Sequence, residues 1–453
     1  MICCSLKLGK IVIDISKNTK FEFLKAVLTK TVRIIPQAYR DDPTVMRTLY
    51  KWLLIGLLIR FIFMPIALHA DLISTYHRSY MILNGNAIPA YYTLVQIIQA
   101  SFLALYQFIL PLDQLLMWPT NEMSVPESHW LNVFVENDSV YRALFLFKIP
   151  YLFFDMASAI ILLHLLDEKK RGMLALKFWM INPIGIFAVY IFGRYETIPI
   201  FFVLLSLYFA KKNRIYISMF LLSIAIIERV YPIFFLPIYI LALGKDIKEK
   251  AKLSFVGLFL FIFEILISKI SGSLNGKTIV ETNFIDYILG MKFDLGFNQV
   301  ISIFVFGYGF IILYYIYFQN KNFDSIWKFS LAILLLFYAT SLFHPQYFAW
   351  FTPFIAIAIT KYKEFLKLHI FQIFCFVFIT FYWGKALAGW LFAPIDPQFF
   401  INIPSPAEYI DQFYPILRLM NMFRSILSGT LIFMLLILLT QNNDELKIEK
   451  REN

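Results

Sequence analysis

Long apolar runs recur along most of this chain, and they limit its fold more than any other feature. Several approach or exceed the roughly 20 residues that an α-helix needs to cross a bilayer. Helices satisfy their own backbone polar groups, so such runs favour helices over open sheets. The composition agrees, since 60% of the residues are hydrophobic and only 16% are charged. The sequence therefore predicts an all-α polytopic membrane protein.

The charge distribution predicts how the chain is oriented. A net charge of +11 would suggest a nucleic-acid partner in a soluble protein. Here the basic residues lie in short segments between apolar runs, which is the positive-inside pattern, so we expect no nucleic-acid partner. We expect a cytosolic basic arm over residues 1–49, a transmembrane domain over 50–440 and a cytosolic tail over 441–453. The arm is read either as a solvated tail or as an amphipathic helix on anionic lipid.

A large external loop is predicted over residues 69–140, because residues 79–140 contain no Lys or Arg. The apolar stretch 93–112 lies within this loop. If it crossed the membrane, every later basic segment would fall outside, so we expect an interfacial or re-entrant helix. Its polar residues suit an amphipathic helix at the membrane surface: Gln96, Gln99 and Gln107.

The other apolar runs bring the total to about twelve predicted membrane segments. They are 50–68, 141–166, 173–192, 197–210, 215–227, 231–243, 254–272, 298–318, 328–343, 346–360, 367–384 and 415–440. Two pairs meet at breaks, one at Glu228-Arg229 and one at His344-Pro345-Gln346. Irregular backbone at membrane depth is tolerated where it is buried in protein or lines a wet cavity.

Ionisable residues lie at the ends of these runs, and the predicted topology brings several of them to the external side. Asp71 follows the first run, Glu196, Glu228-Arg229 and His344 follow at later breaks, and the loop 385–414 reaches the same side. Such groups are costly in or beside a bilayer, which makes them functional candidates. We therefore expect them to share one cavity.

Three further polar features lie within the apolar runs, and we assign them to the architecture. Asp155 and Glu264 are expected to be paired or hydrogen-bonded, because an unpaired buried charge is costly. Asn182-Pro183 is expected to kink its segment.

The order of the motifs resembles the GT-C membrane glycosyltransferases. It is most similar to mannosyltransferases of the GPI mannosyltransferase I type and to related prokaryotic polyprenyl-phosphate-sugar transferases. The likeness covers most of residues 50–360. The motifs that carry it are Asp71, Asn84-Gly85 with Pro89 and Tyr91, FKIPYLFFDMASAIILLHLLDEKKR, FWMINPIGIFAVYIFGRYETIPIFFVLLSLYF, ERVYPIFFLPIYIL and HPQYFAWFTPF.

The resemblance implies a reaction and a site. A hexose, with mannose favoured, would move with inversion from a polyprenyl- or dolichyl-phosphate donor to a lipid-linked glycan, glycolipid or protein acceptor on the external side. Asp71 would be the base that deprotonates the acceptor, and Glu196 would orient the acceptor hydroxyl or hold Arg194. A guanidinium suits phosphate, so Arg229 would bind the donor. The remaining residues expected to contact the substrates are Arg194, His344, Gln346 and Lys385.

Some of these residues could instead have a purely structural role. Glu196 and the Glu228-Arg229 pair also fit ion pairs at helix ends, and His344 also fits a capped turn. The family's paired acidic motif is incomplete here, because His69-Ala70-Asp71-Leu72-Ile73 holds one carboxylate. We predict no cofactor or metal, and Cys3, Cys4 and Cys375 give neither a disulfide framework nor metal-ligand spacing.

Two other classes of protein share some of these features. Transporters and lipid flippases also contain broken helices and intramembrane charges, but they often show two inverted halves, which this sequence lacks. A non-catalytic membrane subunit would keep the fold and dispense with Asp71. The strong use of Ile, Lys and Phe favours a prokaryotic plasma membrane, with an endoplasmic reticulum as the eukaryotic alternative.

Overall fold

The computed structural model describes residues 34–86, 92–116, 131, 133–271 and 288–440. Several sequence predictions fall outside these residues: most of the basic arm, the tail 441–453, Cys3, Cys4, Pro89 and Tyr91.

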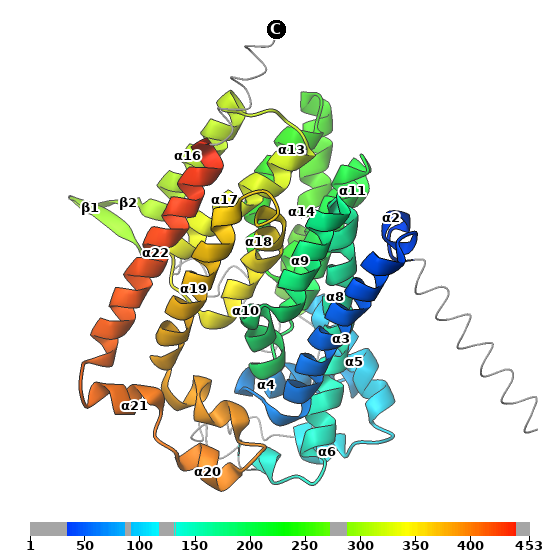
Figure 1. Cartoon of the computed structure of the whole chain (residues 1–453), viewed down its shortest axis with the longest axis vertical. Coiled ribbons are helices and arrows are strands. Elements are labelled where there is room, and N and C mark those ends of the chain that lie inside the picture. Colours follow the sequence, from blue (N-terminus) through cyan, green and yellow to red (C-terminus); the bar gives the residue numbers. More distant parts are fainter. Residues whose placement is uncertain (1–33, 87–91, 117–130, 132, 272–287, 441–453) are drawn as a thin grey trace, which may run out of the picture.

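Long helices run side by side along the long axis of the molecule (Figure 1). Five of the described helices are long and apolar enough to cross a membrane: α3 (Pro43–Ile66), α8 (Val140–Leu165), α17 (Phe323–Thr340), α19 (Lys363–Phe381) and α22 (Ile416–Thr440). A sixth candidate is a bent pair, in which α9 (Lys169–Ile181) meets Pro183–Ile191 at 41°. This architecture is that of an all-α integral membrane protein.

Other helices pack against these candidates and against one another. They are α11 (Thr197–Lys211), α12 (Ile215–Glu228), η3 (Tyr231–Phe235), α13 (Leu236–Leu243), α14 (Ile247–Ser271), α16 (Ile303–Phe318), η5 (Pro345–Phe351) and α18 (Thr352–Ala358). The bent pair continues after α9 as α10 (Pro183–Ile186) and η2 (Phe187–Ile191).

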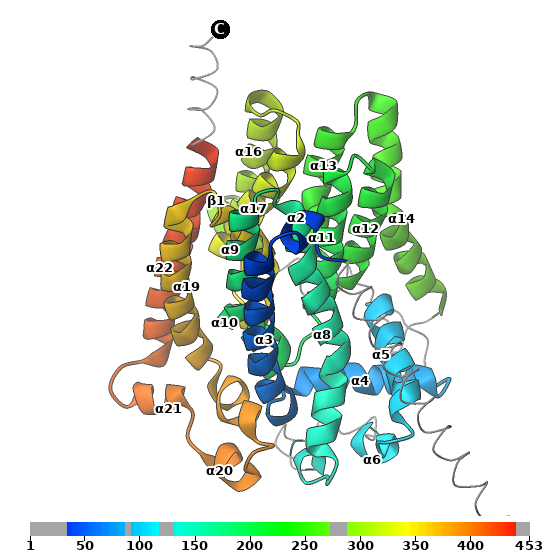
Figure 2. The same cartoon turned by 45° about the vertical axis from the view of Figure 1, so that its right-hand side comes forward.

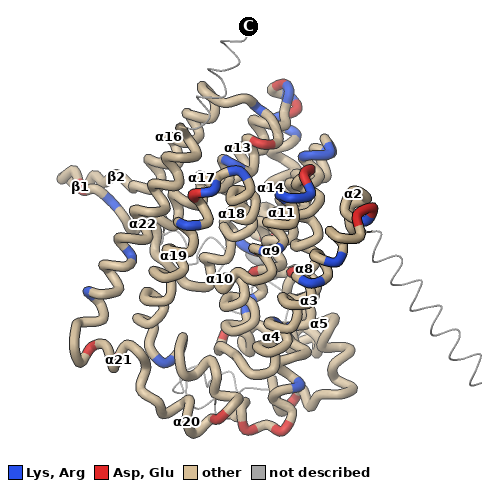
Figure 3. The backbone as a smooth tube through the Cα atoms, viewed as in Figure 1, with Lys and Arg blue, Asp and Glu red and all other residues tan. Residues whose placement is uncertain are grey.

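Shorter elements gather at one end of the bundle, which we call the α4 end (Figures 1 and 2). They are α4 (Ala70–Leu83), α5 (Thr93–Tyr106), α6 (Leu112–Leu116), η6 (Gly384–Leu387), η7 (Gly389–Phe392), α20 (Pro397–Asn402) and α21 (Pro406–Asp411). Lys and Arg residues gather in the loops at the opposite end, which we call the basic end (Figure 3). The two ends therefore differ in charge as the positive-inside rule requires of two membrane faces.

Local sequence signals explain where several helices begin. The Asp42 side chain accepts hydrogen bonds from the backbone N–H groups of Thr44 and Val45, and Pro43 occupies the first position of α3. Asn322 and Ser325 form a capping box at the start of α17. The expected breaks are also present, since α12 ends at Glu228 and α17 ends at Thr340 before short 3₁₀ turns begin.

A buried ion pair joins α3 to α8 and accounts for Asp155. Arg60 Nε lies 2.5 Å from Asp155 Oδ2, which also accepts from the Tyr190 hydroxyl at 2.6 Å. Trp179 Nε1 donates to the other oxygen at 2.8 Å. The carboxylate is thus paired and hydrogen-bonded, as an intramembrane charge must be. The Asn182 side chain accepts from Ile184 N at 2.9 Å and caps the helix after the bend.

The sequence reading of α5 was wrong about its polar face. Gln96 and Gln99 are buried rather than solvated, and Gln99 bonds the hydroxyls of Ser79 and Tyr151 at 2.8 and 2.6 Å. Ile97 and Leu105 lie on the outside and are 47% and 65% exposed. Gln99 therefore holds α5 to α4 and α8.

A small hairpin replaces the start of one expected helix. Strands β1 (Lys292–Gly296) and β2 (Gln299–Ser302) pair antiparallel, and α16 begins only at Ile303 rather than near residue 298. The two residues between the strands, Phe297 and Asn298, have φ values of 53° and 61°. Positive φ at both central positions is typical of a type I′ hairpin turn, which an apolar count does not reveal.

Candidate active site

A cavity of about 240 Å³ lies at the α4 end and joins distant parts of the chain. Its lining comes from the corner between α3 and α4, the end of η2, the break after α17 and the segment after α19. The lining residues are Leu68, His69, Ala70, Asp71, Leu131, Phe192, His344, Trp383, Ala386, Leu387 and Trp390.

Asp71 stands on the first turn of α4, with its side chain 36% exposed in this cavity. The His69 ring caps the helix by accepting from Asp71 N at 3.2 Å. Asp71 Oδ2 lies 3.0 Å from Arg194 Nη1 and 3.9 Å from His69 Nδ1. Asp71 Oδ1 has no hydrogen-bond partner among the described residues. One oxygen is therefore held and the other is available.

Charges around Asp71 decide its protonation state. Burial raises the pKa of its carboxyl group, but Arg194, His69, His344 and Arg229 together lower that pKa below the ordinary value. Burial lowers the pKa of His69 and of His344 to about 4, with Arg194 acting in the same direction. At neutral pH the cavity therefore holds an ionised aspartate and two neutral imidazoles.

Glu196 connects the two arginines of the site. It is fully buried, and its carboxylate binds Arg229 through two bonds, with Nη2 at 2.5 Å and Nε at 3.1 Å. Arg194 Nε lies 3.8 Å away from it. Trp350 Nε1 donates a further hydrogen bond at 2.6 Å. This arrangement fixes the planar guanidinium of Arg229 and sets Arg194 between Glu196 and Asp71.

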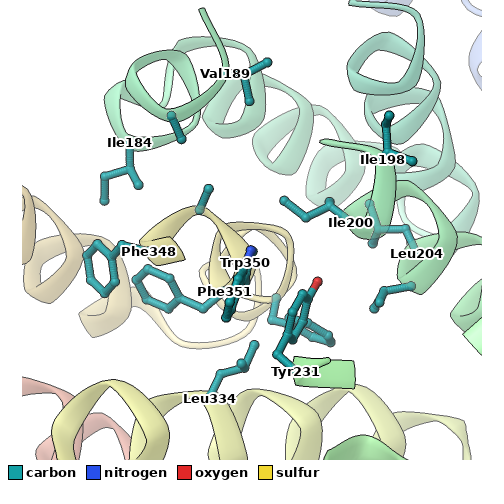
Figure 4. Close-up of a cluster of buried hydrophobic side chains, with 14 of the residues drawn as sticks. Ile184, Val189, Ile198, Ile200, Leu204, Tyr231, Leu334, Phe348, Trp350 and Phe351 are labelled. Carbon is teal, nitrogen blue, oxygen red and sulfur yellow. The ribbon is translucent and has the colours of Figure 1, made fainter. Parts of the chain in front are cut away.

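Aromatic rings enclose Arg229. Its guanidinium carbon lies 4.5 Å from the ring centroid of Tyr195, 5.0 Å from that of Tyr92 and 5.5 Å from that of Tyr347. Behind Glu196, Trp350 stacks on Tyr231 with centroids 4.3 Å apart, within the buried cluster of Figure 4. The arginine is thus held in a dry, polarisable setting that strengthens its electrostatic effect.

The other predicted site residues lie close to the cavity. The His344 ring is 4.7 Å from that of Trp383, and His344 Nδ1 has no hydrogen-bond partner among the described residues. Gln346 is buried, and its Oε1 accepts no hydrogen bond from any residue that the structure describes. Lys385 lies in η6, two residues after Trp383, and is half-buried; its ammonium group has no hydrogen bond or ion pair to any described residue.

Glu228 does not pair with its neighbour Arg229. Its carboxylate accepts from the backbone N–H groups of Leu94 and Val95 at 2.8 and 3.1 Å, which are in the first turn of α5. Glu264 accepts from the Thr93 hydroxyl at 2.8 Å at the same helix end. Both glutamates therefore anchor α5 by accepting hydrogen bonds at its N-terminal end.

Lys148 was not singled out from the sequence, yet it supports the corner that carries Asp71. Its ammonium group is fully buried and donates to the carbonyls of Met64 at 2.9 Å, Ala67, and Tyr190 at 2.8 Å. It thereby caps the C-terminal end of α3 just before Asp71. A lysine inside the motif FKIPYLFFD was itself a usable signal, because a charge within an apolar run needs partners.

A second cavity of about 510 Å³ adjoins the first and shares Trp383 with it. It lies between the ends of α17, α19 and α22 and is lined mainly by apolar and aromatic side chains. Arg424 lies on its α22 side, where it donates to the carbonyls of Tyr338 and Ser341 at 2.7 and 2.8 Å. Among the described residues, no group of three or more His, Cys, Asp or Glu could hold a metal ion.

One comparison with known proteins finds a partial similarity. Over 100 residues, 21% of this chain, the sequence is 28% identical to GPI mannosyltransferase 1 of Kluyveromyces lactis, and the match covers 24% of that protein. No family model and no solved structure matches the chain. The similarity points towards membrane glycosyltransferases.

Proposed function

We propose that this protein is a membrane glycosyltransferase of the GT-C type, with about twelve membrane segments and both termini cytosolic. It transfers a hexose, with mannose as the first choice, from a polyprenyl- or dolichyl-phosphate donor to a lipid-linked glycan, glycolipid or protein acceptor at the α4 end. The observation that carries the proposal is Asp71, a carboxylate with one held and one available oxygen in a cavity beside the partly buried Arg194 and the buried Arg229. The partial similarity to a mannosyltransferase agrees with it.

The proposed chemistry is a single displacement with inversion. Asp71 Oδ1 takes the proton of the acceptor hydroxyl as that oxygen bonds to the anomeric carbon. The bond from this carbon to the phosphate oxygen breaks, and the polyprenyl phosphate leaves with the electron pair. Arg194 acts twice, because it keeps Asp71 ionised and lies where a departing phosphate needs positive charge.

We assign the other polar residues to the donor. Arg229 is the second cation, and Glu196 positions both arginines rather than taking a proton itself. Lys385, which is unpaired among the described residues, adds a mobile charge for the phosphate, and His344 and Gln346 contact phosphate or sugar. The second cavity suits the first isoprene units of the lipid, since its wall is largely apolar.

The decisive experiment incubates purified protein with labelled polyprenyl-phosphate mannose and a glycolipid acceptor. Asp71→Asn should keep the fold and donor binding while turnover falls by about a hundredfold to ten-thousandfold. The matched control is Asp113→Asn, an exposed carboxylate on α6 at the same end, which should keep full activity.

Near-normal transfer by Asp71→Asn would mean that another residue is the base. Retained transfer after replacing both Asp71 and Glu196 would remove the enzyme assignment, and a wild-type protein that moves the donor across a vesicle without transferring its sugar would be a flippase.

A further inference from the structure

The cavity that holds Asp71 has a second wall from a distant part of the chain. Trp383, Ala386, Leu387 and Trp390, between α19 and α20, face the corner at His69 to Asp71. This segment is fixed in place, because Leu68 N donates to the Leu391 carbonyl at 2.9 Å and the Tyr141 hydroxyl donates to the Pro394 carbonyl at 2.6 Å. The wall is therefore part of the site.

Polar atoms on this side of the cavity are left without partners. Trp390 Nε1 is buried and has no hydrogen-bond partner among the described residues, and the same holds for His344 Nδ1. A buried indole N–H normally finds an acceptor, because leaving it unpaired is costly. No described residue accepts a hydrogen bond from Trp390, and its side chain lines the cavity, so the cavity is where we look for the missing acceptor.

The size and the ring arrangement of the cavity indicate what that ligand is. At about 240 Å³ it falls below the roughly 300–1,000 Å³ of sites for drug-sized ligands, so it suits one monosaccharide better than an oligosaccharide. The rings of Trp383 and His344 contact each other, with centroids 4.7 Å apart, and both add flat surface to the cavity wall. A pyranose ring offers an apolar C–H face to such surfaces and a hydroxyl edge to an N–H donor.

Trp383 also separates the two cavities, since it lines both. A donor with its hexose in the smaller cavity and its isoprene units in the larger one has its phosphate near this indole. Lys385 lies two residues further along and is unpaired within the described chain. The order of sugar, phosphate and lipid along the donor thus matches the order of the smaller cavity, Trp383 with Lys385, and the larger cavity on the protein.

We propose that Trp383 and Trp390 form the hexosyl subsite of the donor, with Trp390 Nε1 donating to one ring hydroxyl and so selecting the sugar. The inference rests on the proposed function, and it places sugar selection in the segment after α19.

The test measures binding of a farnesyl phosphate and of its mannosyl ester to wild-type protein and to Trp390→Phe in detergent. Phe keeps an aromatic ring, although a smaller one than indole, and lacks the N–H, which bonds nothing within the described residues. We expect the mannose to add affinity in the wild type. Trp390→Phe should lose about tenfold of the affinity for the mannosyl ester, the equivalent of one good hydrogen bond, and keep its affinity for farnesyl phosphate. Trp52→Phe on α3 is the matched control and should change neither.

Equal affinity of the wild type for both lipids, or an equal loss for both in Trp390→Phe, would overturn the subsite. The transfer assay separates this from the proposed function. If the wild type transfers sugar and Trp390→Phe keeps the same KM for the donor, the proposed function stands and the subsite is wrong. If binding depends on the sugar but no transfer occurs, the subsite stands and the proposed function is wrong.

If Trp390→Phe does not fold, wild-type protein and deoxy sugars give the same answer. Mannosyl donors lacking one hydroxyl at a time should include one that loses about tenfold in affinity. If none does, no hydroxyl is bound by Trp390 and the inference is wrong.

Discussion

Arg194 lowers the pKa of the Asp71 carboxyl group more than any other nearby cation, and this has a measurable consequence. Burial alone raises the pKa of the Asp71 carboxyl group, and the nearby cations, Arg194 first, bring it below the ordinary value. A base must be ionised, so the rate falls as the pH drops through this pKa. Arg194→Gln removes the strongest of these cations, so the acid limb of kcat/KM should move to higher pH.

The pH profile of kcat/KM for transfer measures the shift. The matched control is Arg142→Gln, an exposed arginine at the same end that donates to the Ile109 carbonyl, and it should leave the limb in place. If the acid limb of kcat/KM lies at the same pH in Arg194→Gln as in the wild type, a group other than Asp71 controls it.

The sequence predicted much of the polar site but only one side of the cavity. Asp71, Glu196, Arg229 and His344 were expected together because each follows the end of an apolar run, and the structure brings them close. The loop 385–414 was expected on the same side, but Trp383 and Trp390 were not singled out, because their place depends on how this distant segment folds back over Leu68. Single aromatic residues in an aromatic-rich chain give no local signal of that contact.

At the scale of elements, two lysines cap helices at opposite ends of the bundle, the fully buried Lys148 and the partly buried Lys211. Lys148 bonds carbonyls at the end of α3 beside Asp71, whereas Lys211 bonds the Leu165 carbonyl at 2.8 Å at the end of α8. Methionine at either position leaves carbonyls unpaired, which should lower the free energy of unfolding by about 1–3 kcal/mol. Only Lys148→Met should also lower turnover, because only α3 leads into the corner that holds Asp71.

Thermal unfolding in detergent and turnover per folded molecule separate the two effects. Lys211→Met serves as the control for stability loss without loss of chemistry. Normal turnover per folded molecule in Lys148→Met would contradict the positioning role.

The sequence predicted helix boundaries well where a proline marks them. Pro232 and Pro345 lie just inside the turns that follow the two predicted breaks, and Pro43 opens α3. The direction of the α5 polar face did not follow from the sequence. A period of glutamines shows that one face is polar, but it does not show whether water or protein covers that face.

At the scale of the whole molecule, the charge difference between the two ends predicts which end faces the cytosol. The basic end carries the lysine-rich loops, and Asp and Glu residues lie along the α4 end (Figure 3). The α4 end also holds the cavity with Asp71. We therefore expect residues of α6 and α20 to be external and the loops after α8 and α11 to be cytosolic. The same orientation brings donor and acceptor to Asp71 from outside.

Single cysteines test this orientation in a protein whose Cys3 and Cys4 are replaced by Ser; the third, Cys375, is buried. A membrane-impermeant maleimide added to intact cells should label Gln114→Cys and Gln398→Cys, which lie exposed at the α4 end. It should label Lys170→Cys and Lys212→Cys, exposed at the basic end, only after the membrane is opened. Labelling of all four positions from one side would contradict a bundle that spans the membrane with these two faces. Reversed labelling would place Asp71 on the cytosolic side, and a transferase acting there would have to take its donor from the cytosolic leaflet.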